Sequence, residues 1–133
     1  MRNVIFFILA LGLFSCGISN ERPLIGFDAV LMNSDSTSVL TSKEDKVVIN
    51  YKDGDMMRQL YDVSVENNGE YYTFSSVSAL GIKDNPLYID YNGKVDTLII
   101  TQSSFYADEP FEGTFNGKRI YLEKYQGLMY LVR

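Results

Sequence analysis

Two Asn-Gly dipeptides in the second half of the chain constrain its fold more than any other sequence feature. Asn92-Gly93 and Asn116-Gly117 each lie between segments in which apolar and polar residues alternate. Two-residue type I′ turns favour Asn-Gly because both central residues need positive φ. Each dipeptide therefore predicts an antiparallel β-hairpin. The paired segments are Leu87–Tyr91 with Lys94–Thr101, and Phe111–Phe115 with Lys118–Lys124.

The two-residue loop also fixes the register of the second hairpin. Counting outward from the turn gives the opposed pairs Phe115–Lys118, Thr114–Arg119, Gly113–Ile120, Glu112–Tyr121 and Phe111–Leu122. Side chains alternate between the two faces of a strand. Phe111, Ile120 and Leu122 are therefore predicted to share the inner face, and Tyr121 the outer face. In the first hairpin the same alternation places Tyr88 on the face opposite the apolar side chains of its strand.

The rest of the chain after residue 23 also consists of short, apolar-rich segments separated by turn residues, with no helical spacing. In Gln59–Glu66, Tyr61, Val63 and Val65 are expected to face the core. Val77–Ile82 fits a loop or a single helical turn. The further predicted strands are Phe27–Met32, Val39–Leu40, Lys46–Tyr51, Gln59–Glu66, Tyr71–Phe74 and Leu128–Val132. The pattern predicts an all-β fold, a single antiparallel β-sandwich (Ig-like or transthyretin-like) or a small barrel, of about eight strands.

The first sixteen residues follow a different pattern. Met1–Asn3 carry one positive charge, and Val4–Phe14 are eleven residues without a polar side chain. Ser15, a small residue, precedes Cys16. A charged start, an apolar run of this length and a small residue at the end are typical of a secretory signal peptide. A membrane-spanning helix needs about 20 apolar residues, so this run is too short to be one.

Leu13-Phe14-Ser15-Cys16 resembles the lipobox of bacterial lipoproteins, which commonly reads Leu-Ala/Ser-Gly/Ala-Cys. Phe14 departs from that pattern because it is bulkier than the usual residue. The resemblance implies that the Cys16 thiol is diacylglycerated, that signal peptidase II cuts before it, and that the new amine is acylated. It divides the chain into a signal peptide (1–15), a lipidated cysteine with a short tether (16–23) and a single β domain (24–133).

The residues after the cysteine bear on where the lipoprotein would reside. In the Gram-negative sorting rule an Asp after the cysteine retains the protein at the inner membrane, and here Gly17 follows Cys16. Glu21 is the only acidic residue in the tether, whereas a surface-export tag would be an acidic cluster. The resemblance therefore implies an outer-membrane lipoprotein that faces the periplasm, with the membrane as a partner through the anchor.

Composition excludes several classes of function. The chain has no histidine and a single cysteine, so a hydrolase with a histidine base, a histidine- or thiolate-based metal site and an intramolecular disulfide are ruled out. Without the signal peptide the chain has eleven basic and seventeen acidic side chains, a net charge of −6. Nucleic-acid binders need a basic patch, so no nucleic-acid partner is expected. We expect no cofactor, no metal and no enzymatic activity.

Two acidic clusters and a methionine pair are further candidate sites. Asp53-Gly54-Asp55 resembles the start of a calcium loop, but Met56 and Met57 stand where oxygen ligands would be needed. We interpret it as a solvated turn, and the two methionines as a folded-back loop, with an adaptable contact as the alternative. Asp108, Glu109 and Glu112 (the second cluster) could be paired carboxylates or cation ligands. We interpret them as a surface loop.

The tyrosines are the best candidates for a contact surface. The chain has ten tyrosines and no tryptophan. Tyr88 and Tyr121 are predicted on the outer faces of the two hairpins, where a tyrosine could stack on a sugar or anchor a protein partner. The alternative is that tyrosine is simply a good strand former.

The leading hypothesis is a non-catalytic binding or accessory module that contacts an envelope protein or glycan. The alternative is an inhibitor or immunity lipoprotein against a secreted toxin or hydrolase, using an acidic face.

Overall fold

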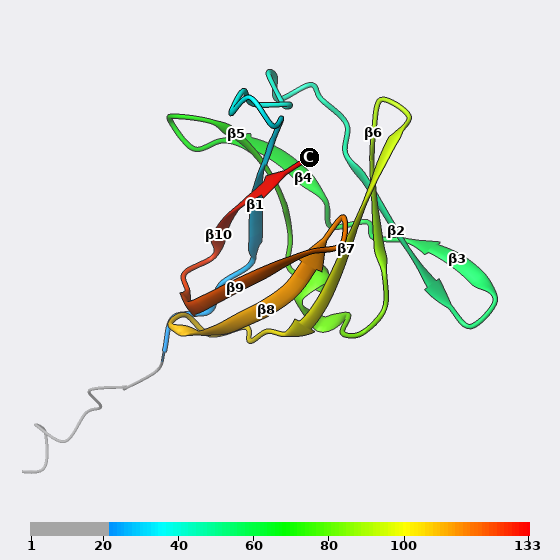
Figure 1. The fold of residues 1–133 in the computed structure, drawn as a ribbon, viewed down its shortest axis with the longest axis vertical. Coiled ribbons are helices and arrows are strands. Elements are labelled where there is room, and N and C mark those ends of the chain that lie inside the picture. The colour runs from blue at the N-terminus through cyan, green and yellow to red at the C-terminus, as the bar shows by residue number, and fades with distance from the viewer. Residues whose placement is uncertain (1–21) are drawn as a thin grey trace, which may run out of the picture.

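A computed structural model describes residues 22–133, which form ten strands and one 3-10 turn (Figure 1). The predicted signal peptide, Cys16 and most of the tether lie outside the described residues. Within the described part, no helix is long and apolar enough to span a membrane. The elements are β1 (Phe27–Met32), β2 (Val48–Asp53), β3 (Met56–Gln59), β4 (Ser64–Asn67), β5 (Tyr72–Ser76), η1 (Ser78–Gly81), β6 (Leu87–Tyr91), β7 (Lys94–Gln102), β8 (Glu109–Phe115), β9 (Lys118–Tyr125) and β10 (Leu128–Val132).

The strands form two sheets that pack face to face, so the predicted β-sandwich is confirmed. The four-stranded sheet has the order β10-β1-β5-β4, and the six-stranded sheet has the order β3-β2-β6-β7-β8-β9. The two sheets share no strand among the described residues, which therefore form a sandwich and not a closed barrel. Strand β1 pairs in parallel with β10 and antiparallel with β5. The other ladders are antiparallel.

Both Asn-Gly hairpins are confirmed. Asn92 and Gly93 have φ values of 53° and 78°, and Asn116 and Gly117 have values of 49° and 79°. These positive angles are those of type I′ turns. The register of the β8–β9 hairpin also agrees with the predicted one, from Phe115 opposite Lys118 to Phe111 opposite Leu122. Local turn chemistry therefore fixes the pairing of four of the six strands of the larger sheet, as two hairpins.

The core lies between the sheets and takes every second side chain from each. Most of its residues are aliphatic or phenylalanine, and they are almost completely buried. The four-stranded sheet contributes Phe27, Ala29, Leu31, Phe74, Met129 and Leu131, and the six-stranded sheet contributes Ile49, Leu87, Ile89, Leu98, Ile100, Phe111 and Phe115. The alternation decides which side chains remain for the outer surfaces.

The predicted strand over Gln59–Glu66 is wrong in its middle. Strand β3 ends at Gln59 and β4 begins at Ser64, in the other sheet. Tyr61 lies in the crossing segment and is 91% exposed, so it does not face the core. The segment between the two strands is held by Asp62, whose carboxylate accepts hydrogen bonds from the Ser76 hydroxyl and the Ser78 backbone N–H, both at 2.8 Å.

The carboxylate of Asp62 fixes the start of η1. Desolvation raises its pKa, but the hydrogen bonds from Ser78 and Ser76 outweigh this, so that the pKa is lowered overall. The carboxylate is therefore bound as an anion: Asp62 is exposed, as alternation indicates, but it is held by hydrogen bonds that alternation does not indicate. The structure also replaces two other predictions. Val39–Leu40 forms no strand, because the only pairing there is an isolated bridge between Ser38 and Met32. Met56 and Met57 lie in strand β3 and not in a loop.

Candidate contact surface on strand β10

The structure places Tyr88 and Tyr121 on the outer face of the six-stranded sheet, as predicted, but apart from each other. Tyr121, on β9, is 51% exposed, and the Arg119 guanidinium carbon lies 5.2 Å from its ring centroid. Tyr88, on β6, is only half-buried, between Asn50 and Thr97 on the neighbouring strands. Strands β7 and β8 lie between β6 and β9. With roughly 4.8 Å between neighbouring strands, β6 and β9 are about 14 Å apart. The two tyrosines do not form one site.

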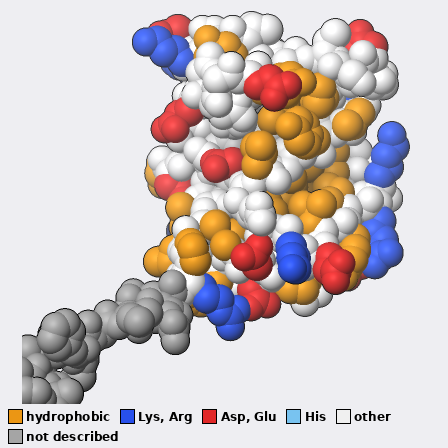
Figure 2. Space-filling view, turned by 90° about the vertical axis from the view of Figure 1, so that its left-hand side faces the viewer, with side chains coloured by type: hydrophobic (Ala, Val, Ile, Leu, Met, Phe, Trp, Pro, Cys, Tyr) orange, Lys and Arg blue, Asp and Glu red, His pale blue; other side chains and the backbone are white. Residues whose placement is uncertain are grey.

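A more continuous apolar surface lies on β10. Met129 and Leu131 of this strand point into the core, so Leu128, Tyr130 and Val132 point outward. Their exposed fractions are 38%, 50% and 42%. We call these three residues, with Tyr71 beside them, the β10 face. Figure 2 shows hydrophobic side chains gathered on this side of the molecule, with basic side chains at one border.

Packing against β1 and β5 holds the β10 face in place. The parallel ladder sets Tyr130 beside Val30 and Val132 beside Met32. Val30 and Met32 are buried although they lie outside the core cluster, because the outer side chains cover them. Tyr71, directly before β5, meets Tyr130 edge to face, with ring centroids 6.0 Å apart. Such aromatic pairs prefer this geometry, so Tyr130 is presented in a fixed orientation.

A groove runs between the β10 face and strand β9. These strands are the last ones of their sheets and do not pair with each other, so the sandwich is open along this side. The groove has a volume of about 170 Å³ and is lined by Phe115, Lys118, Arg119, Ile120, Tyr130 and Val132. Sites for small molecules usually measure about 300–1,000 Å³. The groove is therefore better matched to a few side chains of a partner than to a whole small ligand.

The two ends of this surface differ in charge. At the groove, Lys118 and Arg119 provide positive charge, and the Arg119 Nη2 is 2.8 Å from Glu112 Oε1. At the other end, Asp28 lies beside Leu128 in the β1–β10 ladder. Burial raises the pKa of Asp28, and the negative charge of Glu66 raises it further. An approaching partner would meet apolar side chains between a basic border and a carboxylate whose charged form is disfavoured.

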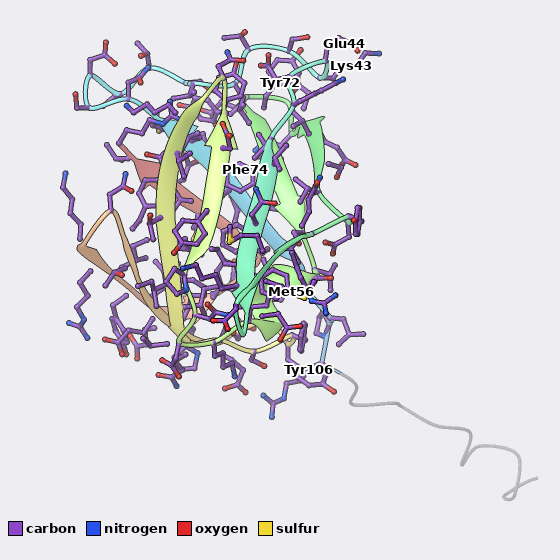
Figure 3. The ribbon with its side chains drawn as sticks, turned by 90° about the vertical axis from the view of Figure 1, so that its right-hand side faces the viewer. Lys43, Glu44, Met56, Tyr72, Phe74 and Tyr106 are labelled. Carbon is purple, nitrogen blue, oxygen red and sulfur yellow. The ribbon has the colours of Figure 1, made fainter. Side chains whose placement is uncertain are left out.

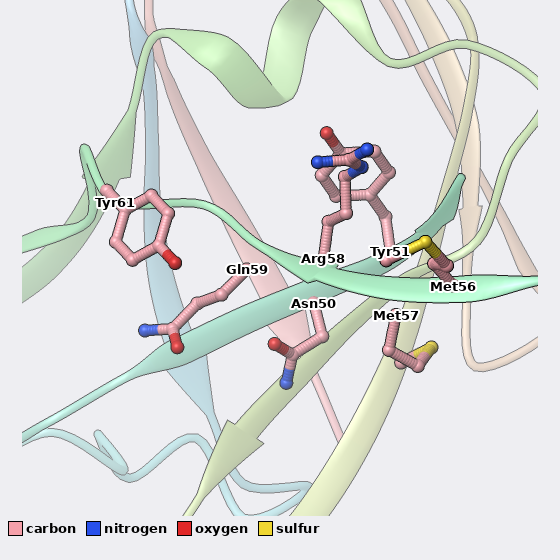
Figure 4. Close-up of a pocket in the computed structure, with 7 residues that line it drawn as sticks. All are labelled: Asn50, Tyr51, Met56, Met57, Arg58, Gln59 and Tyr61. Atoms are coloured by element: carbon pink, nitrogen blue, oxygen red, sulfur yellow. The ribbon is translucent and has the colours of Figure 1, made fainter.

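A second exposed surface is the β2–β3 ribbon, which extends from the sandwich (Figures 1 and 4). Figure 4 shows Tyr51, Met56 and Arg58 on one side of the ribbon and Asn50, Met57 and Gln59 on the other. A hollow of about 560 Å³ is lined by these residues and Tyr61. All four residues of β3 are exposed. The hollow is therefore an open surface around a thin ribbon and not an enclosed site.

The acidic clusters do not converge into a site. Asp53 accepts a hydrogen bond from Arg58 Nε at 2.6 Å, and Asp108 accepts one from Gln126 at 3.1 Å. Glu109 pairs with Arg22, and Glu112 pairs with Arg119. Among residues 22–133 no group of three acidic, histidine or cysteine side chains is placed to hold a metal ion. The predicted turn is present at Gly54 and Asp55, directly after β2, but the second cluster is not the expected surface loop, because Glu109 and Glu112 belong to strand β8 and only Asp108 precedes it.

The tyrosines prove to have different roles that alternation alone does not separate. Tyr125 is buried, and its hydroxyl donates to the Gly127 carbonyl at 2.7 Å and lies 3.4 Å from the Asp28 backbone N–H. Burial raises the pKa of Tyr125 far above its usual value. This residue ties the end of β9 to β1 and to the start of β10. Tyr130 is an exposed tyrosine that is not among the predicted contact residues, although the pattern Leu128-x-Tyr130-x-Val132 indicates an apolar outer face.

Comparisons with known proteins give no relative from which a role could be transferred. No protein-family model matches the chain, and no match is found among curated proteins or among solved structures.

Proposed function

We propose that this protein is a lipid-anchored envelope protein of the outer membrane, and that its β domain is a non-catalytic module that binds another envelope protein through the β10 face. The observation that carries the proposal is the row of Leu128, Tyr130 and Val132, each more than a third exposed, on the edge strand of a sandwich that is open at that side. Contiguous exposed apolar patches on soluble domains mark interaction sites.

The composition of the patch favours a protein partner over a glycan. Interface energy is concentrated in a few aromatic or arginine anchors surrounded by apolar contacts. Tyr130 is such an anchor, held by Tyr71 and flanked by Leu128 and Val132. Arg119 lines the same groove, and its guanidinium group stacks on the ring of Tyr121. Tyr121 therefore stays in the proposed contact, whereas half-buried Tyr88 lies outside it.

The inhibitor or immunity alternative has less support from the geometry. It requires an acidic face, and the candidate carboxylates Asp53, Glu109 and Glu112 are each paired with an arginine. The apolar β10 face has no part in that hypothesis. Identification of the captured protein separates the two: a resident envelope protein supports the binding module, and a secreted toxin or hydrolase supports the alternative.

We predict that Tyr130→Ala weakens recovery of the partner in a pull-down from detergent-solubilised envelope. Removing a central tyrosine from an interface commonly costs about 2 kcal/mol or more, or roughly thirtyfold in affinity. The matched control is Tyr61→Ala on the other exposed surface, since Tyr61 is the most exposed of the large hydrophobic residues among residues 22–133. Recovery should be unchanged in the control.

The opposite result would assign the contact to a different surface. If Tyr61→Ala abolishes recovery and Tyr130→Ala does not, the β2–β3 ribbon is the contact surface. Because Tyr130 also packs on Tyr71, Val132→Lys provides a second test of the β10 face at a side chain that is 42% exposed. Normal recovery with both Tyr130→Ala and Val132→Lys would refute the proposed surface.

The anchor is tested separately. Cys16→Ser removes the only thiol of the chain, so incorporation of labelled palmitate should fall to background and the mature mass should lose its acyl chains. One acyl chain holds a protein to a bilayer only marginally, and several hold it stably. The wild-type protein should therefore fractionate with the outer membrane. Equal label in the wild type and in Cys16→Ser would contradict the proposed anchor.

A further inference from the structure

A second group of exposed apolar side chains lies where the described chain begins. Leu24, Val77, Phe105 and Tyr106 are exposed by 73%, 56%, 43% and 48%. We call these four residues the tether end. In Figure 3, Tyr106 is labelled beside the point where the chain leads away toward residue 21. In Figure 2, hydrophobic side chains again gather next to that point, with an arginine or lysine and acidic side chains near them.

Two of the three segments that form the tether end are joined by backbone hydrogen bonds. Leu24 makes an isolated antiparallel bridge with Tyr106. Beside it, the Ile25 N–H donates to the Phe105 carbonyl at 2.8 Å, and the Ala107 N–H donates to the Pro23 carbonyl at 3.0 Å. These bonds hold the entering chain against the segment between β7 and β8, so the exposed side chains keep a fixed relation to the sandwich.

Val77 and Phe105 each pack over a glycine. Val77 lies over Gly26, and Phe105 lies over Gly81 in η1, each within van der Waals reach of the position that a Cβ would occupy. The four apolar side chains of the tether end do not belong to the core cluster, and each keeps more than two fifths of its surface exposed.

The length of chain before this surface limits what can meet it. Cys16 precedes Arg22 by six residues. A fully extended chain spans at most about 3.6 Å per residue, so the first described residue lies within about 22 Å of the anchored cysteine. If Cys16 carries acyl chains, the bilayer is the surface nearest to the tether end.

The charges at this end are arranged so that an apolar contact is possible. Glu109 pairs with Arg22, and Asp108 accepts a hydrogen bond from Gln126. The Arg22 guanidinium carbon also lies 6.0 Å from the Tyr106 ring centroid. Long basic side chains and tyrosines combine an apolar body with a polar tip, which suits the boundary between lipid and water.

We propose that the tether end rests on the bilayer surface, with Leu24, Phe105 and Tyr106 at the level of the lipid headgroups, so that the anchored domain has a fixed orientation and does not rotate freely on its tether. This inference rests on the proposed lipid anchor. The contact would be apolar and would not depend on anionic lipid, because the domain itself is acidic.

The chain has no tryptophan, so a single introduced tryptophan reports its own surroundings. The test uses the full, lipidated protein in phosphatidylcholine vesicles whose acyl chains carry bromine, a contact quencher of indole fluorescence. Phe105→Trp should lose most of its emission relative to vesicles without bromine, and its emission maximum should shift to shorter wavelength. Leu24→Trp, at the most exposed position of the surface, should behave in the same way.

The matched control is Glu44→Trp. Figure 3 labels Glu44 at the opposite end of the domain from Tyr106, so its emission should be unchanged by bromine. Flotation of the same vesicles reports the anchor. If the protein floats and neither Phe105→Trp nor Leu24→Trp is quenched, the bilayer contact is refuted while the anchor stands. Quenching of Glu44→Trp to the same extent would refute a fixed orientation. If wild type and Cys16→Ser both fail to float, the anchor itself is refuted, and this inference with it.

Discussion

Replacing Arg133 by methionine is expected to lower the free energy of unfolding by about 3–5 kcal/mol, because it leaves a buried carboxylate without its counter-charge. Asp96 lies on the inner face of β7, and its side chain is 2% exposed. Its Oδ2 accepts a hydrogen bond from Arg133 Nε at 2.7 Å, and its Oδ1 accepts one from Asn116 Nδ2 at 2.8 Å. The Arg133 side chain is itself 9% exposed. The expected loss is a large share of a typical domain stability of about 5–15 kcal/mol.

Arg119→Met is the matched control, because it removes the same charge from a pair whose arginine is 68% exposed. Exposed ion pairs contribute about 0–1 kcal/mol, so the control should change stability little. Urea unfolding followed by circular dichroism measures both variants. A loss below about 1 kcal/mol for Arg133→Met would show that the Asp96 carboxylate does not depend on the Arg133 charge in the folded protein.

The double variant Asp96→Leu with Arg133→Met should recover most of the lost stability. Burying two charges costs desolvation energy that their attraction repays only when every polar atom is satisfied. The Arg133 Nη2 is buried without a hydrogen-bond partner in the described structure. The pair is therefore expected to add little net stability. Its expected role is to fix the position of the residue after β10 against β7 and the β8–β9 turn.

The features that the sequence predicted well are those fixed by local chemistry. The two Asn-Gly turns set their own φ angles, and the two-residue loop then sets the register of β8 and β9. Strand β1 was also predictable, with the bounds Phe27–Met32 observed in the structure. These elements need no information from distant parts of the chain.

The features that could not be predicted depend on distant partners. The segment Gln59–Glu66 alternates like a strand, but its two ends belong to different sheets, and Asp62 binds the η1 turn between them. Strand β10 was predicted, but its parallel pairing with β1, about a hundred residues earlier, was not. That pairing makes β10 an edge strand and exposes Tyr130. Alternation located Tyr121 and Tyr88 on outer faces, but the degree of exposure depends on neighbouring strands.

Gly113→Ala is expected to destabilise the domain by about 3 kcal/mol or more, because the added methyl group would overlap with backbone atoms of strand β7. Gly113 lies on the inner face of β8, opposite Ile120 on one side and Ile100 on the other. A Cβ at this position would lie well inside van der Waals contact of the Ile99 carbonyl oxygen and 3.3 Å from the Ile100 Cα. Neither atom is the end of a flexible side chain, so strand β7 itself would have to move.

The position of Gly113 makes such a movement costly. Strand β7 pairs with β6 and β8 within the six-stranded sheet, and the ladder with β8 shifts register directly after Ile100. Displacing β7 would disturb Leu98 and Ile100 in the core, and with them the packing against the four-stranded sheet. The same movement would disturb β9 and the groove beside Tyr130, so loss of partner binding should accompany the loss of stability.

Gly26→Ala is the matched control for this prediction. A Cβ at Gly26 would lie 3.5 Å from Val77 Cγ2, an ordinary contact with a side chain, so the change should stay within about 1 kcal/mol. Thermal unfolding by circular dichroism distinguishes the two: the midpoint should fall by more than 10 °C for Gly113→Ala, at roughly 4–8 °C per kcal/mol for a domain of this size, and by a few degrees or less for the control. Equal midpoints would mean that β7 and β8 separate at the register shift without cost, and that the close approach of their backbones is not needed for the sandwich.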